Sequence, residues 1–108
     1  MNRRGNKVYE VKYHYLVVKK DILKLSGDGR AIIKKQIEVK LTTRPEVFGK
    51  PLRQSLKGYR KLRVGDYRII FKIVGRVVFI LLIEHRSVVY QEVFKRISIE
   101  RGIQTKSV

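Results

Sequence analysis

Three basic side chains near the middle of the chain could together bind a phosphate. Lys61 and Arg63 are two residues apart, so in a strand they point to the same face. Arg68 follows a tight Gly65-Asp66 turn and can meet them from the neighbouring antiparallel strand. Arginine suits this task because its planar guanidinium grips two oxygens at once, and grouped cations stabilise negative charge in a transition state. The spacing alone favours a generic phosphate-binding or protein-binding face over a catalytic site.

A second set of reactive side chains lies in the segment HRSVVY, which begins at His85. His85 is the best candidate for proton transfer because the ordinary pKa of imidazole lies nearest neutrality. Arg86 could contact a phosphate, and Tyr90 could stack on a splayed base or orient a hydroxyl group. The residues alone leave other roles open: a structural histidine at a strand end, a surface arginine and a core tyrosine.

The composition predicts neither a metal site nor a membrane segment. The sequence has no cysteine, and its two histidines, His14 and His85, are far apart with no carboxylate pattern nearby, so we expect no metal and no cofactor. We assign His14 a structural role. No run of apolar residues approaches the ~20 needed to span a bilayer, and none follows the basic N-terminus as in a signal peptide. We therefore expect a cytoplasmic protein.

The charge of the chain predicts a polyanionic partner. Its 26 Lys and Arg against nine Asp and Glu give a formal net charge of +17, which costs stability by self-repulsion. Residues 50–76 hold nine of these cations against one acid, with apolar residues alternating between them, as in a folded hairpin. Nucleic acid, an acidic protein and an anionic membrane surface are the candidate partners. Further cations of this segment expected at the binding surface are Lys50, Arg53, Lys57 and Arg60, with Tyr59 as a weaker stacking candidate.

Hydrophobic periodicity predicts a single α+β domain. The expected order is β-α-α-β-β-β-α: a strand at 8–15, helices at 17–25 and 30–42 forming an antiparallel hairpin, a loop at 44–56, strands at 59–64, 67–73 and 76–83, and a helix at 88–97. The last three strands form an antiparallel meander. Residues 1–7 are expected to be a flexible basic arm, 8–97 the core and 98–108 a tail.

The same periodicity predicts which residues face the core. Residues 18, 22 and 25 should form the buried face of the first helix, and 33, 37 and 41 that of the second. Asp28 should cap the second helix, and Ser87 the last, whose buried stripe is 89, 93 and 97. On the strand at 67–73 we expect Arg68, Ile70 and Lys72 to point outward.

Two stretches resemble the RelE/ParE superfamily of toxins from type II toxin–antitoxin pairs. Residues 49–73, GKPLRQSLKGYRKLRVGDYRIIFKI, match the family's loop Gly-Lys-Pro-Leu followed by Leu-x-Gly-Tyr/Trp and a basic hairpin ending in Tyr-Arg. HRSVVY is similar to its His-Arg-x-x-x-Tyr near the C-terminus. A match of this length, with matching order and spacing, is far more specific than a lone motif. The resemblance implies a fold similar to a small microbial ribonuclease.

The chain retains much of the family's set of basic and aromatic catalytic residues. This favours the RelE branch, whose toxins cut mRNA positioned in the ribosomal A site. The resemblance implies RNA-contacting or catalytic roles for Lys61, Arg63, Arg68, Arg86 and Tyr90. Cleavage without metal needs a base for the 2′-hydroxyl, cations at the phosphorane and an acid for the leaving oxygen. We expect Lys61 or His85 as base and His85 or Arg86 as acid. The expected partners are mRNA, ribosomal RNA and an acidic antitoxin, with no small-molecule substrate and no membrane.

Two positions depart from the family's best-known member. Tyr59 stands where that toxin has a lysine, and Glu84 where it has an arginine, so loss of activity is possible on sequence grounds. Two other functions stay open: a ParE-like inhibitor of DNA gyrase, and a basic RNA- or ribosome-binding protein without catalysis.

Overall fold

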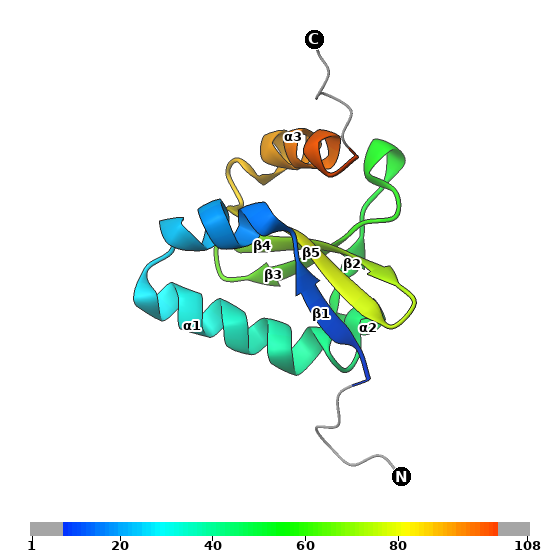
Figure 1. Cartoon of the computed structure of the whole chain (residues 1–108), viewed down its shortest axis with the longest axis horizontal. Helices are drawn as coiled ribbons and strands as arrows, with labels where there is room; N and C mark the ends of the chain where they lie inside the picture. The colour runs from blue at the N-terminus through cyan, green and yellow to red at the C-terminus, as the bar shows by residue number, and fades with distance from the viewer. Residues whose placement is uncertain (1–7, 102–108) are drawn as a thin grey trace.

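The computed structural model describes residues 8–101, which form a mixed sheet with helices on both faces (Figure 1). The predicted arm at 1–7 and the end of the predicted tail, 102–108, lie outside the described residues. The strands are β1 (Glu10–Tyr13), β2 (Lys50–Pro51), β3 (Arg60–Val64), β4 (Tyr67–Val74) and β5 (Val77–His85). The α-helices are α1 (Gly27–Gln36), α2 (Pro45–Phe48) and α3 (Val89–Arg101). Short π and 3-10 segments complete the order: η1 (Val17–Asp21), η2 (Ile22–Lys24), η3 (Ile37–Leu41) and η4 (Gln54–Leu56).

The sheet has the order β1-β5-β4-β3-β2. The predicted meander is confirmed, because β3, β4 and β5 pair antiparallel through tight turns at Gly65 and Gly75, both with positive φ. β1 adds to β5 in parallel, as a strand separated from its neighbour by intervening helices can. The segment predicted as a loop contributes α2 and the two-residue strand β2, which pairs with β3.

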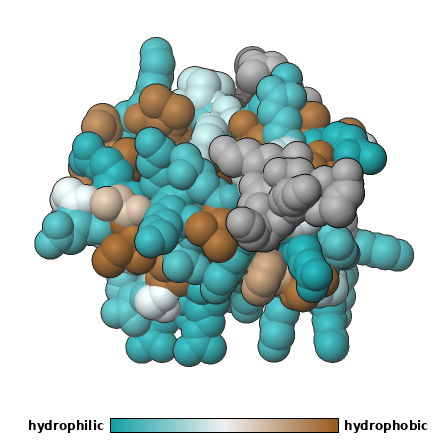
Figure 2. All heavy atoms as spheres, turned by 90° about the horizontal axis from the view of Figure 1, so that it is seen from below, coloured by the Kyte–Doolittle hydropathy of each residue, from teal (hydrophilic) through white to brown (hydrophobic). Residues whose placement is uncertain are grey.

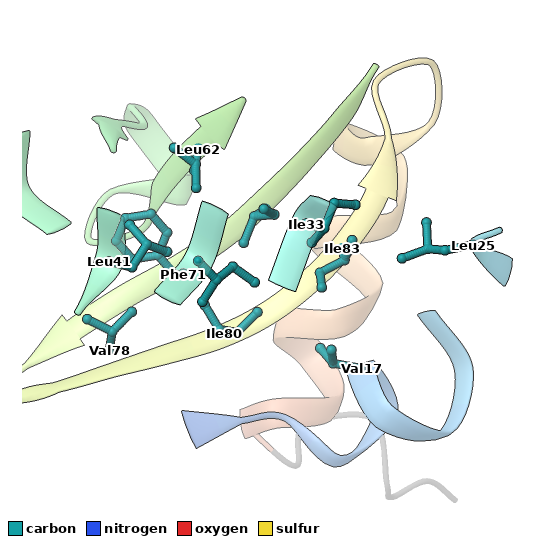
Figure 3. Packing of buried hydrophobic residues seen from close by; sticks show 11 residues of the cluster. Val17, Leu25, Ile33, Leu41, Leu62, Phe71, Val78, Ile80 and Ile83 are labelled. Carbon is teal, nitrogen blue, oxygen red and sulfur yellow. The ribbon is translucent and has the colours of Figure 1, made fainter. Parts of the chain in front are cut away.

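Each face of the sheet carries its own hydrophobic core. One core joins α1 and η3 to the sheet through residues such as Ile33, Leu41, Phe71 and Ile80 (Figure 3). The other lies under α3 and contains Ile70 and the predicted stripe of 89, 93 and 97. The expectation that Ile70 points outward is therefore wrong: it is fully buried because α3 covers the face on which Arg68 and Lys72 also lie.

The first predicted helix differs most from expectation. It forms as η1 followed by η2. Leu25 is buried as predicted and Ile22 packs partly buried against the core, but Val18 is 55% exposed and the other buried positions are Val17 and Asp21. Apolar spacing could not reveal this register, since the central buried residue is an acid. The second helix begins at an N-cap Ser26, whose Oγ accepts a hydrogen bond from the Gly29 amide, so the expected cap at Asp28 is wrong.

Burial of Asp21 is explained by its position at the edge of β5. β1 pairs with β5 only as far as Ile80, which leaves later backbone groups of β5 without a strand partner on this side. The Asp21 carboxylate accepts the Ile83 amide at 2.9 Å and a two-pronged contact from the Arg96 guanidinium at 2.8 and 3.0 Å. Arg96 also donates to the Leu81 carbonyl at 2.9 Å. This buried pair takes the place of a strand and fastens α3 to the sheet.

The remaining helices keep their predicted buried faces but differ in their boundaries. α1 begins at Gly27 and α3 at Val89, so the expected cap of the last helix at Ser87 is wrong: the Ser87 hydroxyl lies against His85 instead. Residues 33, 37 and 41 are buried as predicted, although the helix passes from α1 into η3 between them. α3 continues to Arg101, so residues 98–101 belong to the helix and not to the predicted tail. Within residues 8–101 no helix is long and apolar enough to cross a membrane. The face on the side of α1 carries mainly hydrophilic side chains with hydrophobic ones between them (Figure 2).

Candidate nucleic-acid interface

The predicted basic residues of the hairpin gather around a hollow of about 270 Å³. We call it the cationic hollow; its lining residues are Lys40, Phe48, Lys50, Lys61, Leu62, Arg63 and Arg68. Five of the seven carry a positive charge and none carries a negative one. The hollow therefore offers an anion several donors at once, as the spacing of Lys61, Arg63 and Arg68 predicts.

Strand register brings these cations together. Lys50 of β2 lies opposite Lys61 of β3, and Arg63 of β3 lies opposite Arg68 of β4. Directly opposed residues in an antiparallel pair project to the same face with their Cβ atoms about 5 Å apart. Like charges so placed repel one another unless an anion lies between them. The arrangement costs stability in the free protein and favours a bound phosphate.

Tyr90 joins this group from α3. The Lys61 Nζ donates a hydrogen bond to the Tyr90 hydroxyl at 2.8 Å and lies 5.5 Å from the centre of its ring. Tyr90 is 44% exposed and Phe94 is exposed as well, so the alternative of a core tyrosine does not hold. Because the Tyr90 oxygen accepts from Lys61, its own proton is available to an oxygen of a ligand.

The Arg68 side chain is held close to its own turn. It is 9% exposed, and its Nη1 donates to the carbonyls of Gly65 and Tyr67, both at 3.0 Å. These two contacts fix the plane of the guanidinium. A guanidinium fixed in this way contacts a phosphate with little further loss of side-chain entropy.

Glu84, the acid that departs from the family pattern, is engaged away from the hollow. It lies opposite Arg68 across β4 and β5, yet its carboxylate accepts the Lys24 Nζ at 2.9 Å and the His85 amide at 3.1 Å. The hydrogen bond that Lys24 donates to Glu84 raises the pKa of Lys24 above its ordinary value. Lys24 thus balances the one carboxylate that could neutralise Arg68.

His85 is not brought to Lys61 and Tyr90. It lies opposite Tyr67, whose ring it meets edge-on at 5.5 Å, and strand alternation puts it on the face away from Glu84 and Arg68. Its Nδ1 accepts the Ser87 amide at 3.1 Å and lies 2.8 Å from the Ser87 hydroxyl. A neutral His85 that accepts at Nδ1 carries its proton on Nε2, an arrangement that disfavours the role of base.

Arg86 lies beside the β3–β4 turn. Its amide donates to the Asp66 carbonyl at 2.8 Å, and its Nε lies 3.7 Å from the Asp66 carboxylate, with both side chains exposed. An exposed pair at this distance holds the side chain weakly, so Arg86 can turn to another anion.

Four predicted contact residues lie elsewhere than expected or have other partners. Tyr59 is 4% exposed within the core under α3 and donates to Glu100 at 3.2 Å, so its ring offers no stacking surface. Arg60 donates to the carbonyls of Gly49 and Glu46, which ties it to the loop after α2. Arg53 and Lys57 are exposed around η4 and do not line the hollow.

Sequence reasoning missed Lys40 and Phe48 as lining residues. Lys40 counts in the sequence as one lysine of a solvated helix face, and Phe48 falls in a stretch predicted to be a loop. Their positions depend on how η3 and α2 turn toward β3, which no local pattern encodes. Within residues 8–101, no three His, Asp or Glu side chains gather as metal ligands would.

Comparisons with known proteins identify a toxin family and similar solved structures. Residues 16–90 match the family model described as the ParE toxin of the type II toxin–antitoxin system parDE. The toxin–antitoxin complex RelBE2 from Mycobacterium tuberculosis contains a chain that is 31% identical, with a TM-score of 0.67 over 72% of this chain and 98% of that one. A search of curated protein sequences finds no match.

Two structures of the E. coli toxin RelE are also similar. A double mutant in the free state is 26% identical, with a TM-score of 0.63 over 83% of this chain and 98% of that one. The same mutant in complex with a peptide of the antitoxin RelB is 25% identical, with a TM-score of 0.53 over 79% and 94% of the two chains. The family match and the shared five-stranded fold together establish that the chain belongs to the RelE/ParE family of type II toxins.

Proposed function

We propose that this toxin is a metal-independent endoribonuclease that cuts mRNA on the ribosome, in the cytoplasm. The observation that carries the proposal is the hydrogen bond of 2.8 Å between Lys61 and Tyr90 beside the cationic hollow. A site that only binds RNA needs the cations of the hollow. It does not need a lysine that is hydrogen-bonded to a tyrosine hydroxyl beside the hollow. The paired groups supply both a charge and an exchangeable proton at one place.

The proposed reaction is attack of a 2′-hydroxyl on the adjacent phosphorus. The new oxygen–phosphorus bond forms as the bond to the 5′-oxygen breaks, which leaves a 2′,3′-cyclic phosphate and a 5′-hydroxyl end. Arg63 and Arg68 hold the phosphate, and the Lys61 and Tyr90 pair contacts the 2′-hydroxyl. Lys61 is favoured over His85 as base because His85 lies on the other face, and in this role Lys61 reacts as the neutral amine, whose lone pair takes the 2′-hydroxyl proton. Arg86 is left as the proton donor to the leaving 5′-oxygen, because a His85 that accepts at Nδ1 could give up its Nε2 proton only by becoming an imidazolate.

We also propose that an acidic antitoxin neutralises the toxin, and that cations outside the hollow contact ribosomal RNA. The net charge of +17 supports both partners, since an acidic protein segment and an RNA backbone are both negatively charged and are both attracted to a basic surface. The similar RelBE2 and RelE structures include complexes with antitoxin.

Mapping of mRNA ends in a purified translation system tests the activity. We expect the wild type to produce new 5′-hydroxyl ends in translated mRNA, and Lys61→Ala, Arg68→Ala and Tyr90→Phe to produce far fewer. Gln91→Ala, at an exposed neutral position of α3 next to Tyr90 in the sequence, is the control and should cleave like the wild type. Undiminished cleavage by all three site variants would contradict the role assignments.

The ParE family model favours a second candidate, inhibition of DNA gyrase by protein binding. That function predicts loss of gyrase supercoiling when the toxin is added, and no new mRNA ends. A gyrase assay with the same wild-type and Tyr90→Phe proteins separates the two, because the exchangeable tyrosine proton matters only to the cleavage reaction.

A further inference from the structure

Phe48 is an exposed aromatic ring in the wall of the cationic hollow. It is 41% exposed, at the end of the short helix α2, and shares the hollow with Lys50, Lys61 and Arg63. An exposed ring of this size is costly to hydrate, and its neighbours bind anions rather than apolar groups. Aromatic rings interleaved with cations are the usual means of holding single-stranded RNA, since bases stack while phosphates contact the cations.

The Phe48 ring is presented by a rigid support. Arg60 donates to the Gly49 carbonyl at 2.9 Å and to the Glu46 carbonyl at 3.3 Å, which ties the segment carrying Phe48 to β3. Gly49 packs so closely that a Cβ atom there would lie 2.3 Å from the Phe71 ring. The segment is therefore fixed against the core on both sides of Phe48.

Lys40 completes the arrangement from η3. Its Nζ lies 5.4 Å from the centre of the Phe48 ring, as in a cation–π contact, and it also lines the hollow. One cation thus orients the ring and adds to the field that attracts a phosphate. Phe48 keeps its 41% exposure in the presence of this contact.

We propose that Phe48 is a nucleobase-stacking residue for single-stranded RNA whose phosphates lie on Lys50, Lys61 and Arg63. The inference rests on the proposed function and adds to it a binding surface for the base. It also explains why Tyr59 can be buried: the aromatic contact that the sequence assigned to Tyr59 is supplied from α2. Phe48 and Tyr90 then contact the RNA from two different elements, α2 and α3.

Binding of two matched oligonucleotides tests the proposal. One is a fluorescent ten-nucleotide RNA, 2′-O-methylated so that it cannot be cleaved, and the other has the same backbone without bases. We expect Phe48→Ala to weaken binding of the base-bearing RNA about tenfold, the order of one lost stacking contact, and to leave the abasic RNA unchanged. Phe48→Trp should bind both like the wild type. Lys61→Ala should weaken both.

Val47→Ala is the matched control, because Val47 is exposed on the same short helix and does not line the hollow. It should change neither affinity, and circular dichroism should show Phe48→Ala folded like the wild type. Equal losses for both oligonucleotides, or no loss for either, would overturn the stacking role. So would an effect of Phe48→Ala confined to binding of an acidic antitoxin peptide. If the wild type bound neither oligonucleotide, the proposed RNA function itself would be refuted. If the wild type bound normally and Phe48→Ala bound like the wild type, only the stacking role of Phe48 would be refuted.

Discussion

The ammonium of Lys24 lies 2.9 Å from the carboxylate of Glu84, on the strand directly beside Arg68. This pair joins two segments that are 60 residues apart in the chain. It gives Glu84 a partner other than Arg68. An acid at a position where a related toxin has an arginine is thereby compatible with a cationic site.

Removal of Lys24 should allow Glu84 to weaken the cationic site. In Lys24→Ala the unpaired carboxylate can pair with Arg68, so we expect RNA affinity and cleavage to fall by about twofold to fivefold, the size of one partly exposed ion pair. Lys24→Ala with Glu84→Gln should recover most of the loss. Fluorescence anisotropy and mRNA cleavage measure both variants. A double variant no better than Lys24→Ala would show that Glu84 does not act on Arg68.

The buried pair of Asp21 and Arg96 should be essential to stability. In Asp21→Asn the Arg96 guanidinium stays buried without its carboxylate, so we expect a loss of about 3–5 kcal/mol in the free energy of unfolding. Urea denaturation followed by circular dichroism gives the value. Asp66→Asn, which removes an exposed carboxylate near Arg86, should change stability by less than about 1 kcal/mol. Equal losses of unfolding free energy in the two variants would refute the idea that burial makes the Asp21 and Arg96 pair important for stability.

Stability should fall as the pH drops through the ordinary range of histidine because of His14. Burial, and after it the charge of Arg96, lowers the pKa of His14, while Glu100 and Asp21 oppose the shift. The unfolded chain therefore binds the proton more readily, and the folded state loses stability from about pH 6.5 downward. His14→Gln should flatten this dependence in thermal melts between pH 5 and pH 8. An unchanged slope in His14→Gln would assign the dependence to other groups.

A methyl group at Gly49 should be poorly tolerated. The added Cβ of Gly49→Ala would lie 2.3 Å from the Phe71 ring, so the loop must shift, at a cost of about 1–3 kcal/mol in unfolding free energy. Gly27→Ala is the control, since nothing lies within 4 Å of its added Cβ and alanine favours a helix. Thermal melts compare the two. Similar melting temperatures would mean that the Phe71 ring moves aside freely.

Local patterns in the sequence predict the strands and most buried faces of this fold. Alternation locates β3, β4 and β5, and the spacing of Ile33, Ile37 and Leu41 locates the buried face of the second helical segment. In the first helical segment Leu25 is buried as predicted, but Val18 is exposed and Asp21 is buried, because Asp21 pairs with an arginine 75 residues away. Partners so far apart leave no trace in local periodicity.

The candidate site is predicted in part for the same reason. Lys61, Arg63 and Arg68 meet as expected, since one hairpin fixes their register. Burial of Tyr59 depends on where α3 packs, and the separation of His85 from Arg68 depends on one step of strand alternation at the end of β5. Phe48 enters the site through the path of a loop. These three placements are tertiary and could not be read from spacing.

The Asp21 and Arg96 pair also protects the chain against self-association. β5 contains the uninterrupted apolar run VVFILLI at 77–83, the kind of segment that stacks into cross-β fibrils when its edge is bare. β1 covers the first part of that edge, and two charged side chains occupy the amide and carbonyl that an incoming strand would need. An ion pair that fastens a helix therefore also serves as a gatekeeper, and its loss would expose the most aggregation-prone strand of the toxin.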